Sequence, residues 1–258
     1  MSGDVGSRHA NDDPISWLEQ SITKEVLHNS YKIYNNLPPE TSLPINEAEH
    51  LVHIGKIIWD CKASNKIGVV ALHHHETLLP DHSFVGHIEQ LNKSYYYWTR
   101  KLANERINLD KVCGYKFSYV EGKRLCPFEF RQGQMLDLSG VDKTLFSRIG
   151  QYLIKNYLTS RIGLVLLIPE LSKNKMTEFS LPCGMVQVET ELLPKDQTTV
   201  TTEWHWDPRT GLYGAGVYCV INKKGEHEEL VTKCEGLSKI VDVVNLAEQA
   251  GLLQFEVR

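Results

Sequence analysis

The hydrophobic positions along the chain follow two periods, one helical and one extended. Apolar residues spaced three or four positions apart predict helices from Asp13-Pro14, from Asn46 and from about Val141, and one more near residues 237–250. Two other segments, residues 67–72 and 162–168, are apolar almost throughout. Such short apolar runs predict strands that are buried on both faces.

Further segments alternate between apolar and polar residues, as half-buried antiparallel strands do. This pattern covers residues 185–193 and 199–207. Residues 112–120 and 124–130 flank Glu121-Gly122-Lys123, which predicts a hairpin with glycine at its turn.

These elements predict a single α+β domain over residues 14–258. Its sheet would be largely antiparallel or mixed, with about seven or eight strands, and covered by several helices. No internal repeat and no long Gly/Ser linker divides the chain. Residues 1–13 are polar and predict a disordered tail, with the pattern of neither a secretory signal nor an Arg-rich transit peptide.

Composition narrows the class of protein. With 41% hydrophobic and 23% charged residues, the chain has the composition of a soluble globular protein. A net charge of -4 and a pI near 6.3 argue against nucleic-acid binding, and the absence of a long apolar stretch argues against a membrane span. The six cysteines are scattered without a Cys-x-x-Cys pair, so we expect reduced thiols and a cytoplasmic location.

The run His73-His74-His75-Glu76 follows the first apolar strand directly. If the strand continues through it, His73 and His75 share one face and His74 and Glu76 share the other. A His-x-His pair on a strand supplies two ligands of a zinc or non-haem iron site. The alternative is that the run only marks the end of the strand, where the imidazoles are solvated or hydrogen-bonded.

The second candidate constellation is Glu203-Trp204-His205-Trp206-Asp207. His205-x-Asp207 is the opening pair of a 2-His-1-carboxylate site. The alternative is an outward polar face opposite two core tryptophans. Pairing residues 185–193 with 199–207 as a hairpin would place Glu189 opposite Glu203, and two such carboxylates with one raised pKa could act as general acid and base.

We therefore predict an intracellular enzyme that acts on a small organic molecule at a histidine-centred site, with no nucleic-acid or membrane partner. The predicted catalytic residues are His73, His75, His205 and Glu203. The predicted ligands of a divalent metal, zinc or iron, are His73, His75, His205 and Asp207. The alternative is a non-catalytic protein that binds a small molecule or another protein and whose histidines are structural.

The stretch from Gly68 to Glu76, with Leu72-His73-x-His75 within it, resembles a Leu-His-x-His strand of uncharacterised fungal proteins of similar size. In those proteins the strand also follows a helix like that of Asn46 to Lys62. The resemblance covers residues 45–90. It implies this local arrangement of helix and strand, and no particular activity.

Overall fold

The computed structural model describes residues 18, 21–43, 47–120, 124–207, 213–221, 237 and 239–253. The predicted tail at residues 1–13 and the predicted helix start at Asp13-Pro14 lie outside these residues. The turn Glu121-Gly122-Lys123 lies outside them as well.

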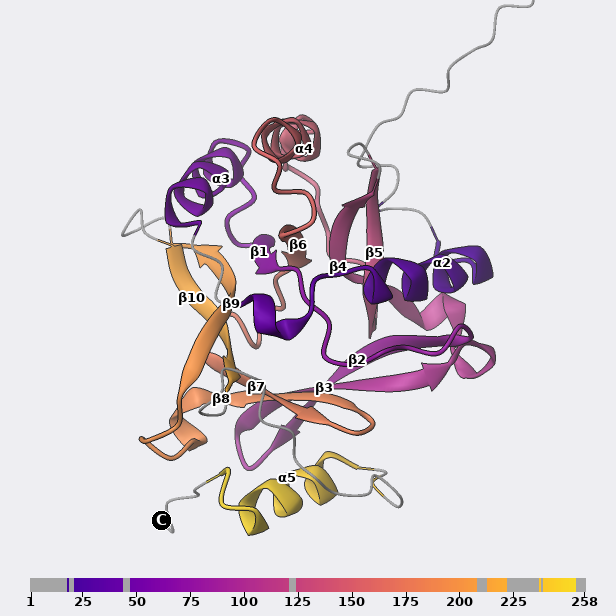
Figure 1. Cartoon of the computed structure of the whole chain (residues 1–258), viewed down its shortest axis with the longest axis vertical. Coiled ribbons are helices and arrows are strands. Elements are labelled where there is room, and N and C mark those ends of the chain that lie inside the picture. Colours follow the sequence, from indigo (N-terminus) through magenta and orange to yellow (C-terminus); the bar gives the residue numbers. More distant parts are fainter. Residues whose placement is uncertain are drawn as a thin grey trace, which may run out of the picture.

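The strands form one closed barrel (Figure 1). They are β1 (Ile67–Ala71), β2 (His82–Leu91), β3 (Ser94–Ala103), β4 (Val112–Val120), β5 (Arg124–Gln132), β6 (Ile162–Leu166), β7 (Met176–Leu181), β8 (Gly184–Glu189), β9 (Thr199–Trp206) and β10 (Tyr213–Val220). Around the barrel their order is β1-β6-β4-β5-β2-β3-β8-β7-β10-β9, and β1 pairs with β9 to close the ring. The pairs β2–β5 and β7–β10 are parallel and the other neighbours are antiparallel.

The predicted α+β sheet covered by several helices is therefore wrong. Alternation along a strand shows that its two faces differ, and it does not show whether the sheet is open or closed on itself. The predicted hairpin of residues 185–193 with 199–207 is also wrong, because β8 pairs with β3 and β7, while β9 pairs with β1 and β10. The hairpin of β4 and β5 is confirmed, with Val120 opposite Arg124.

The two predicted buried strands are confirmed as β1 and β6, which pair with each other in antiparallel register. In β1, Val69 packs outward in the core shared with the covering helices, whereas Val70 packs inward in the core shared with Tyr97 and Tyr115. Both faces are apolar because one lies under helices and the other lines the barrel.

The helices lie outside the barrel (Figure 1). They are α2 (Lys24–Asn35), α3 (Ala48–Asp60), α4 (Leu145–Lys155) and α5 (Ile240–Gln249), with the short 3₁₀ turns η1 (Glu40–Ser42), η2 (Asn104–Arg106), η3 (Leu109–Lys111) and η4 (Thr190–Leu192). In α4, Leu145, Ile149 and Leu153 are spaced by four and are all buried, so one stripe of the helix faces β1 and β6. None of the helices in the described ranges is long and apolar enough to cross a membrane.

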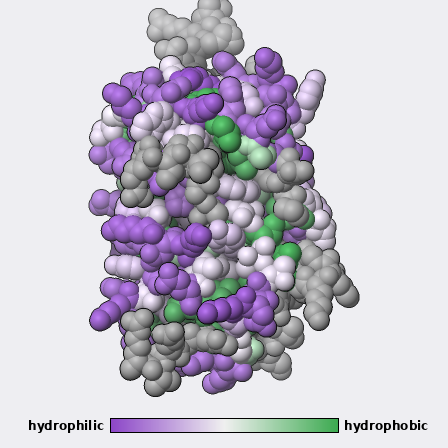
Figure 2. All heavy atoms as spheres, turned by 90° about the vertical axis from the view of Figure 1, so that its left-hand side faces the viewer, coloured by the Kyte–Doolittle hydropathy of each residue, from purple (hydrophilic) through white to green (hydrophobic). Residues whose placement is uncertain are grey.

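The four helices cover three faces of the barrel. The helices α3 and α4 pack together over β1 and β6, α5 packs on the core of β3, β7 and β8, and α2 lies beside β2 and β5 (Figure 1). On the face that carries α3 and β10, hydrophilic side chains predominate and hydrophobic ones reach the surface only in small separate spots (Figure 2). Apolar contacts with these helices thus cover much of the outer wall of the barrel.

The connection from α2 to α3 crosses the end of the barrel where the histidine run lies (Figure 1). The His74 N–H donates to the Pro38 carbonyl at 2.9 Å, and the His75 N–H donates to the Tyr34 hydroxyl at 3.1 Å. These bonds fix the backbone of the run after the regular part of β1 has ended at Ala71.

The cysteines differ in state. Cys61, Cys113, Cys126 and Cys219 are thiols that form no disulfide, as expected. Cys183 is disulfide-bonded, so the expectation of reduced thiols throughout is wrong at this position.

Candidate active site in the barrel interior

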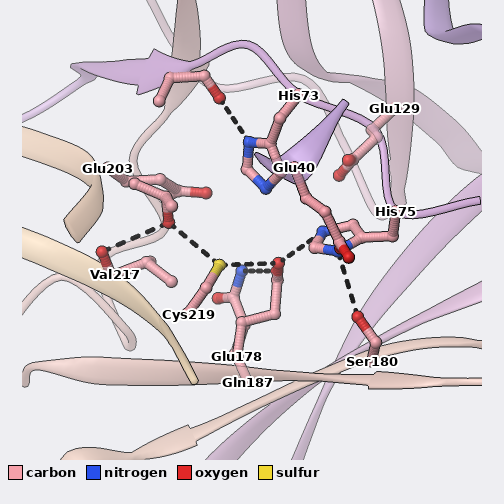
Figure 3. Close-up of polar contacts among 12 residues, drawn as sticks. Glu40, His73, His75, Glu129, Glu178, Ser180, Gln187, Glu203, Val217 and Cys219 are labelled. Carbon is pink, nitrogen blue, oxygen red and sulfur yellow. Dashed lines mark hydrogen bonds and ion pairs between the residues drawn. The ribbon is translucent and has the colours of Figure 1, made fainter. Parts of the chain in front are cut away.

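Polar side chains from six strands and the histidine run meet inside the barrel. Figure 3 shows those on β5, β7, β8, β9 and β10 and in the histidine run. We call this set the interior cluster. Its members are His73, His75, Lys116, Glu129, Glu178, Gln187, Glu203 and Cys219. All of their side chains are buried, so water does not screen the charges they carry.

Lys116 is the centre of the cluster's ion pairs. Its Nζ lies 3.0 Å from Glu203 Oε1, 3.5 Å from Glu129 Oε2 and 3.9 Å from Glu178 Oε2. The register of β4 against β5 shifts on both sides of Lys116, as at a β-bulge. A bulge interrupts the alternation of side chains, and here both Tyr115 and Lys116 are buried.

One ammonium group thus faces three carboxyl groups, and their pKa values move apart. Burial raises the pKa of Glu129 to about 7, against the opposing attraction of Lys116. Burial also raises the pKa of Glu203, again opposed by Lys116. Burial acts in the same direction on Glu178, but Lys116 and a hydrogen bond from His75 outweigh it and hold the pKa of Glu178 well below its usual range.

The pKa of Lys116 itself stays high. Burial would lower it, but the attraction of Glu129, Glu203 and Glu178 is stronger and raises the pKa well above its ordinary value. Lys116 is therefore an ammonium group at neutral pH and not an amine nucleophile.

His75 joins the interior cluster to the connection that covers the barrel end. Its Nε2 lies 3.2 Å from Glu178 Oε1, and its Nδ1 lies 3.4 Å from Glu40 Oε2 and 3.1 Å from the Ser180 hydroxyl. Burial would lower the pKa of His75, but the hydrogen bonds with Glu178 and Glu40 raise it to about 9. His75 is consequently an imidazolium that orients Glu178.

His73 lies beside His75, with ring centroids 4.8 Å apart. Its Nδ1 is 2.8 Å from the Ala71 carbonyl, which can only accept, so Nδ1 carries the proton. One nitrogen of His73, a carboxylate oxygen of Glu178 and the thiol of Cys219 all lie within 4.8 Å of one another. A histidine, a carboxylate and a thiol this close together are a possible set of metal ligands.

A small cavity of about 30 Å³ opens next to the cluster, and Tyr115, Gln187, Glu203 and His205 line part of it. This volume holds about one or two water molecules. The ring of His205 packs directly over Gly216, where an added Cβ would lie 2.5 Å from the imidazole. Burial lowers the pKa of His205 despite the nearby Asp207, so the ring is neutral at pH 7.

The structure thus brings together part of the set predicted from the sequence. His73, His75 and Glu203 belong to the interior cluster. His205 reaches the cavity beside Glu203, and neither His205 nor Asp207 belongs to the group of possible metal ligands that the described residues form around His73. Glu189 is not opposite Glu203. It pairs with Met176 in the sheet and accepts a hydrogen bond from Asn174.

Sequence reasoning missed the residues that complete the cluster. These are Lys116, Glu129, Glu178, Gln187 and Cys219. Lys116 and Glu129 each stand between two aromatic residues of a strand, and Glu178 and Cys219 belong to no repeated spacing that marks a motif. Gln187 lies in the alternating segment of residues 185–193, where its polar character alone did not mark it as a site residue. The sequence feature that could have identified them is a charged residue inside a strongly β-prone segment, such as Lys116 between Tyr115 and Phe117.

Comparison with known proteins gives no relative that would name the chemistry of this cluster. The resemblance of residues 68–76 to uncharacterised fungal proteins stays a prediction. No family model, no curated protein and no solved structure matches the chain.

Proposed function

We propose that the protein is an enzyme that transfers protons to and from a small organic molecule, with Glu203 as its principal acid–base group. One observation carries this proposal: Glu203 is among the residues that line the cavity, and its carboxyl group contacts Lys116, which also contacts two further buried carboxyl groups. Carboxyl groups with raised pKa values at a cavity are typical of general acid–base catalysis.

Glu129 supplies the second carboxyl group of the mechanism. Because its pKa is raised to about 7, it exchanges its proton near neutral pH. Lys116 contacts Glu203 and Glu129 at the same time, so ionisation of one disfavours ionisation of the other. Such coupling keeps one proton on the pair, available for transfer to a substrate through Glu203.

Lys116 and His205 would support the reaction without forming a bond to the substrate. The ammonium of Lys116 stabilises negative charge that develops near Glu203, in surroundings where water does not weaken the interaction. The neutral ring of His205 lines the same cavity and offers one donor and one acceptor to a polar group of the substrate. The cavity has room only for water, so the residues around it must move to admit any organic substrate. The substrate is therefore small, because a large one would need a large displacement of these residues.

The test measures proton transfer directly. The protein is incubated in D₂O with pools of small carbonyl and carboxylic compounds, and loss of substrate C–H signals is followed by NMR. We expect the wild type to catalyse exchange in at least one pool. Glu203→Gln, which cannot carry the ionised form, should lower the exchange rate at least 100-fold, within the range that general acid–base groups contribute.

Glu189→Gln is the matched control, because Glu189 lies on β8 outside the interior cluster and should leave the rate unchanged. Melting curves identify variants that fail to fold, and Glu129→Gln then replaces the primary variant. Absence of exchange in every pool, or an equal rate for Glu203→Gln and the wild type, would contradict the proposal.

A non-catalytic protein is the second candidate, and the cavity volume of about 30 Å³ favours it. In that case the interior cluster only specifies the packing of the barrel, and a binding surface lies elsewhere. Double substitution of His73 and His75 by alanine tests whether these two histidines are structural. A lowered melting temperature with no change in the binding or turnover of any compound supports the structural role.

We further propose a cytoplasmic location, with a small molecule as the partner and neither nucleic acid nor membrane. The acidic balance of the chain supports the absence of nucleic acid. Cell fractionation with thiol labelling tests the location. A disulfide at Cys183 that persists in freshly quenched extract contradicts it, because the cytoplasm keeps most thiols reduced.

A further inference from the structure

We propose that His73, Glu178 and Cys219 bind one zinc ion inside the barrel. The site does not depend on proton transfer at Glu203, since it uses different side chains. It also differs from the set predicted from the sequence, because it keeps only His73 and has Glu178 and Cys219 in place of His75, His205 and Asp207.

The spacing of the three donors suits a bound zinc ion. Zinc bonds of about 2.0–2.3 Å in tetrahedral geometry place the ligand atoms about 3.5 Å apart. Cys219 Sγ already lies 3.6 Å from Glu178 Oε1, and all three donor atoms lie within 4.8 Å of one another. A shift of about 1 Å in side-chain position therefore completes the site without moving a strand.

The surroundings orient each ligand as in known metal centres. His73 donates its Nδ1 proton to the Ala71 carbonyl, so that Nε2 carries the lone pair that a metal requires. Glu178 is held through both oxygens, by His75 at Oε1 and by Gln187 at Oε2. Hydrogen bonds of this kind fix the direction of a ligating histidine or carboxylate.

An independent observation points to a missing ligand at this place. Gln187 is 1% exposed, and its Oε1 has no hydrogen-bond partner among the residues that the structure describes. Its Nε2 donates to Glu178, so the amide lies against the proposed site. Three protein ligands leave the fourth position of zinc to a water molecule, which could donate to Gln187 Oε1.

The donor types select the metal. Thiolate, imidazole and carboxylate together suit zinc, whereas magnesium and calcium take oxygen ligands only. The interior cluster also holds the buried carboxylate of Glu178, and a divalent cation offsets the negative charge that the Cys219 thiolate adds on ligation. Zinc therefore suits this set of donors.

The test uses cobalt as a spectroscopic substitute for zinc. Protein without an affinity tag is stripped with a chelator and titrated with Co²⁺, which shows a thiolate charge-transfer band when a cysteine ligates it. We expect one Co²⁺ per chain with that band, displaced by one equivalent of Zn²⁺. Cys219→Ser should abolish the band, and His73→Ala should weaken zinc binding at least 10-fold.

The matched control is Cys113→Ser. Cys113 is a buried residue of β4 whose thiol donates to the carbonyls of Arg131 and Gln134, and it lies outside the interior cluster. It should bind both metals as the wild type does. Circular dichroism verifies the fold, and if Cys219→Ser does not fold, His73→Ala decides the question. Absence of stoichiometric binding by the folded wild type, or a band that survives in Cys219→Ser, would overturn the zinc site.

Discussion

Lys116 Nζ lies 3.0 Å from Glu203 Oε1, and both side chains are enclosed by the barrel. Burying two charges costs more than burying two apolar groups unless each charge keeps a partner. Lys116 keeps three, and this sharing couples β4, β5, β7 and β9 across the barrel interior. The pair therefore ties the packing of the barrel to the chemistry proposed for Glu203.

Lys116→Met should destabilise the protein by about 3–5 kcal/mol at pH 7, because it leaves three carboxyl groups buried without their cation. Lys101→Met is the matched control. Its ion pair with Glu76 is partly exposed, so its loss should cost about 1 kcal/mol or less. Urea unfolding measures both. Equal losses of unfolding free energy in the two variants would show that the interior ion pairs stabilise the fold no more than a partly exposed ion pair does.

Stability should fall as the pH rises from about 4.5 to about 7, through the proton held by Glu129. Its pKa is raised from 4.5 to about 7 by burial, so the folded state binds this proton more tightly than the unfolded state. The contribution is fully present below pH 4.5 and lost above pH 7, and it is of the order of 3 kcal/mol. Unfolding free energies across this range should decline less steeply for Glu129→Gln. The same pH dependence of the unfolding free energy in the wild type and in Glu129→Gln would contradict the raised pKa of Glu129.

Gly216→Ala should displace His205, since the new Cβ would lie 2.5 Å from the imidazole ring. We expect a loss of about 1–3 kcal/mol from overpacking. Adding His205→Ala removes the ring and should recover most of the loss from Gly216→Ala. A double-mutant cycle by chemical denaturation measures the coupling, and strictly additive effects would mean that the two residues do not contact each other.

Tyr157→Gly should stabilise the protein by up to about 1 kcal/mol. Tyr157 follows the end of α4 with φ of 58°, a left-handed conformation that glycine adopts without strain, and its side chain is 90% exposed. Tyr157→Ala is the control, because it removes the ring and keeps the Cβ. Thermal melting should rank the glycine variant above both the alanine variant and the wild type.

The local pattern of the sequence predicted several elements correctly. The apolar runs at residues 67–72 and 162–168 became β1 and β6, and residues 112–130 gave the β4–β5 hairpin. Helical spacing located α3, α4 and α5. These elements are predictable because their periodicity reflects which face each one buries, and that information is local.

The arrangement of β9 shows where local patterns fail. Glu203 and His205 alternate with Trp204 and Trp206, and the sequence favoured an outward polar face. In the barrel Glu203 faces the enclosed interior, and Trp204 packs against the core under α3 and α4. Alternation separates two faces of a strand, but only closure of the sheet decides which of them is enclosed.

The sequence by itself determined the strand and helix segments, because these follow from spacing over a few residues. It placed His73 and His75 on one face of a continuing strand, whereas β1 ends at Ala71 and the two rings lie close together in the irregular run that follows. Only the tertiary structure decided that the strands close, that a bulge buries Lys116 among three carboxyl groups, and that Glu178 and Cys219 lie beside His73. The contacts of His73 join the run after β1 to β7 and β10, which are far apart in the chain. Their register depends on packing around the whole barrel, and no short segment contains that information.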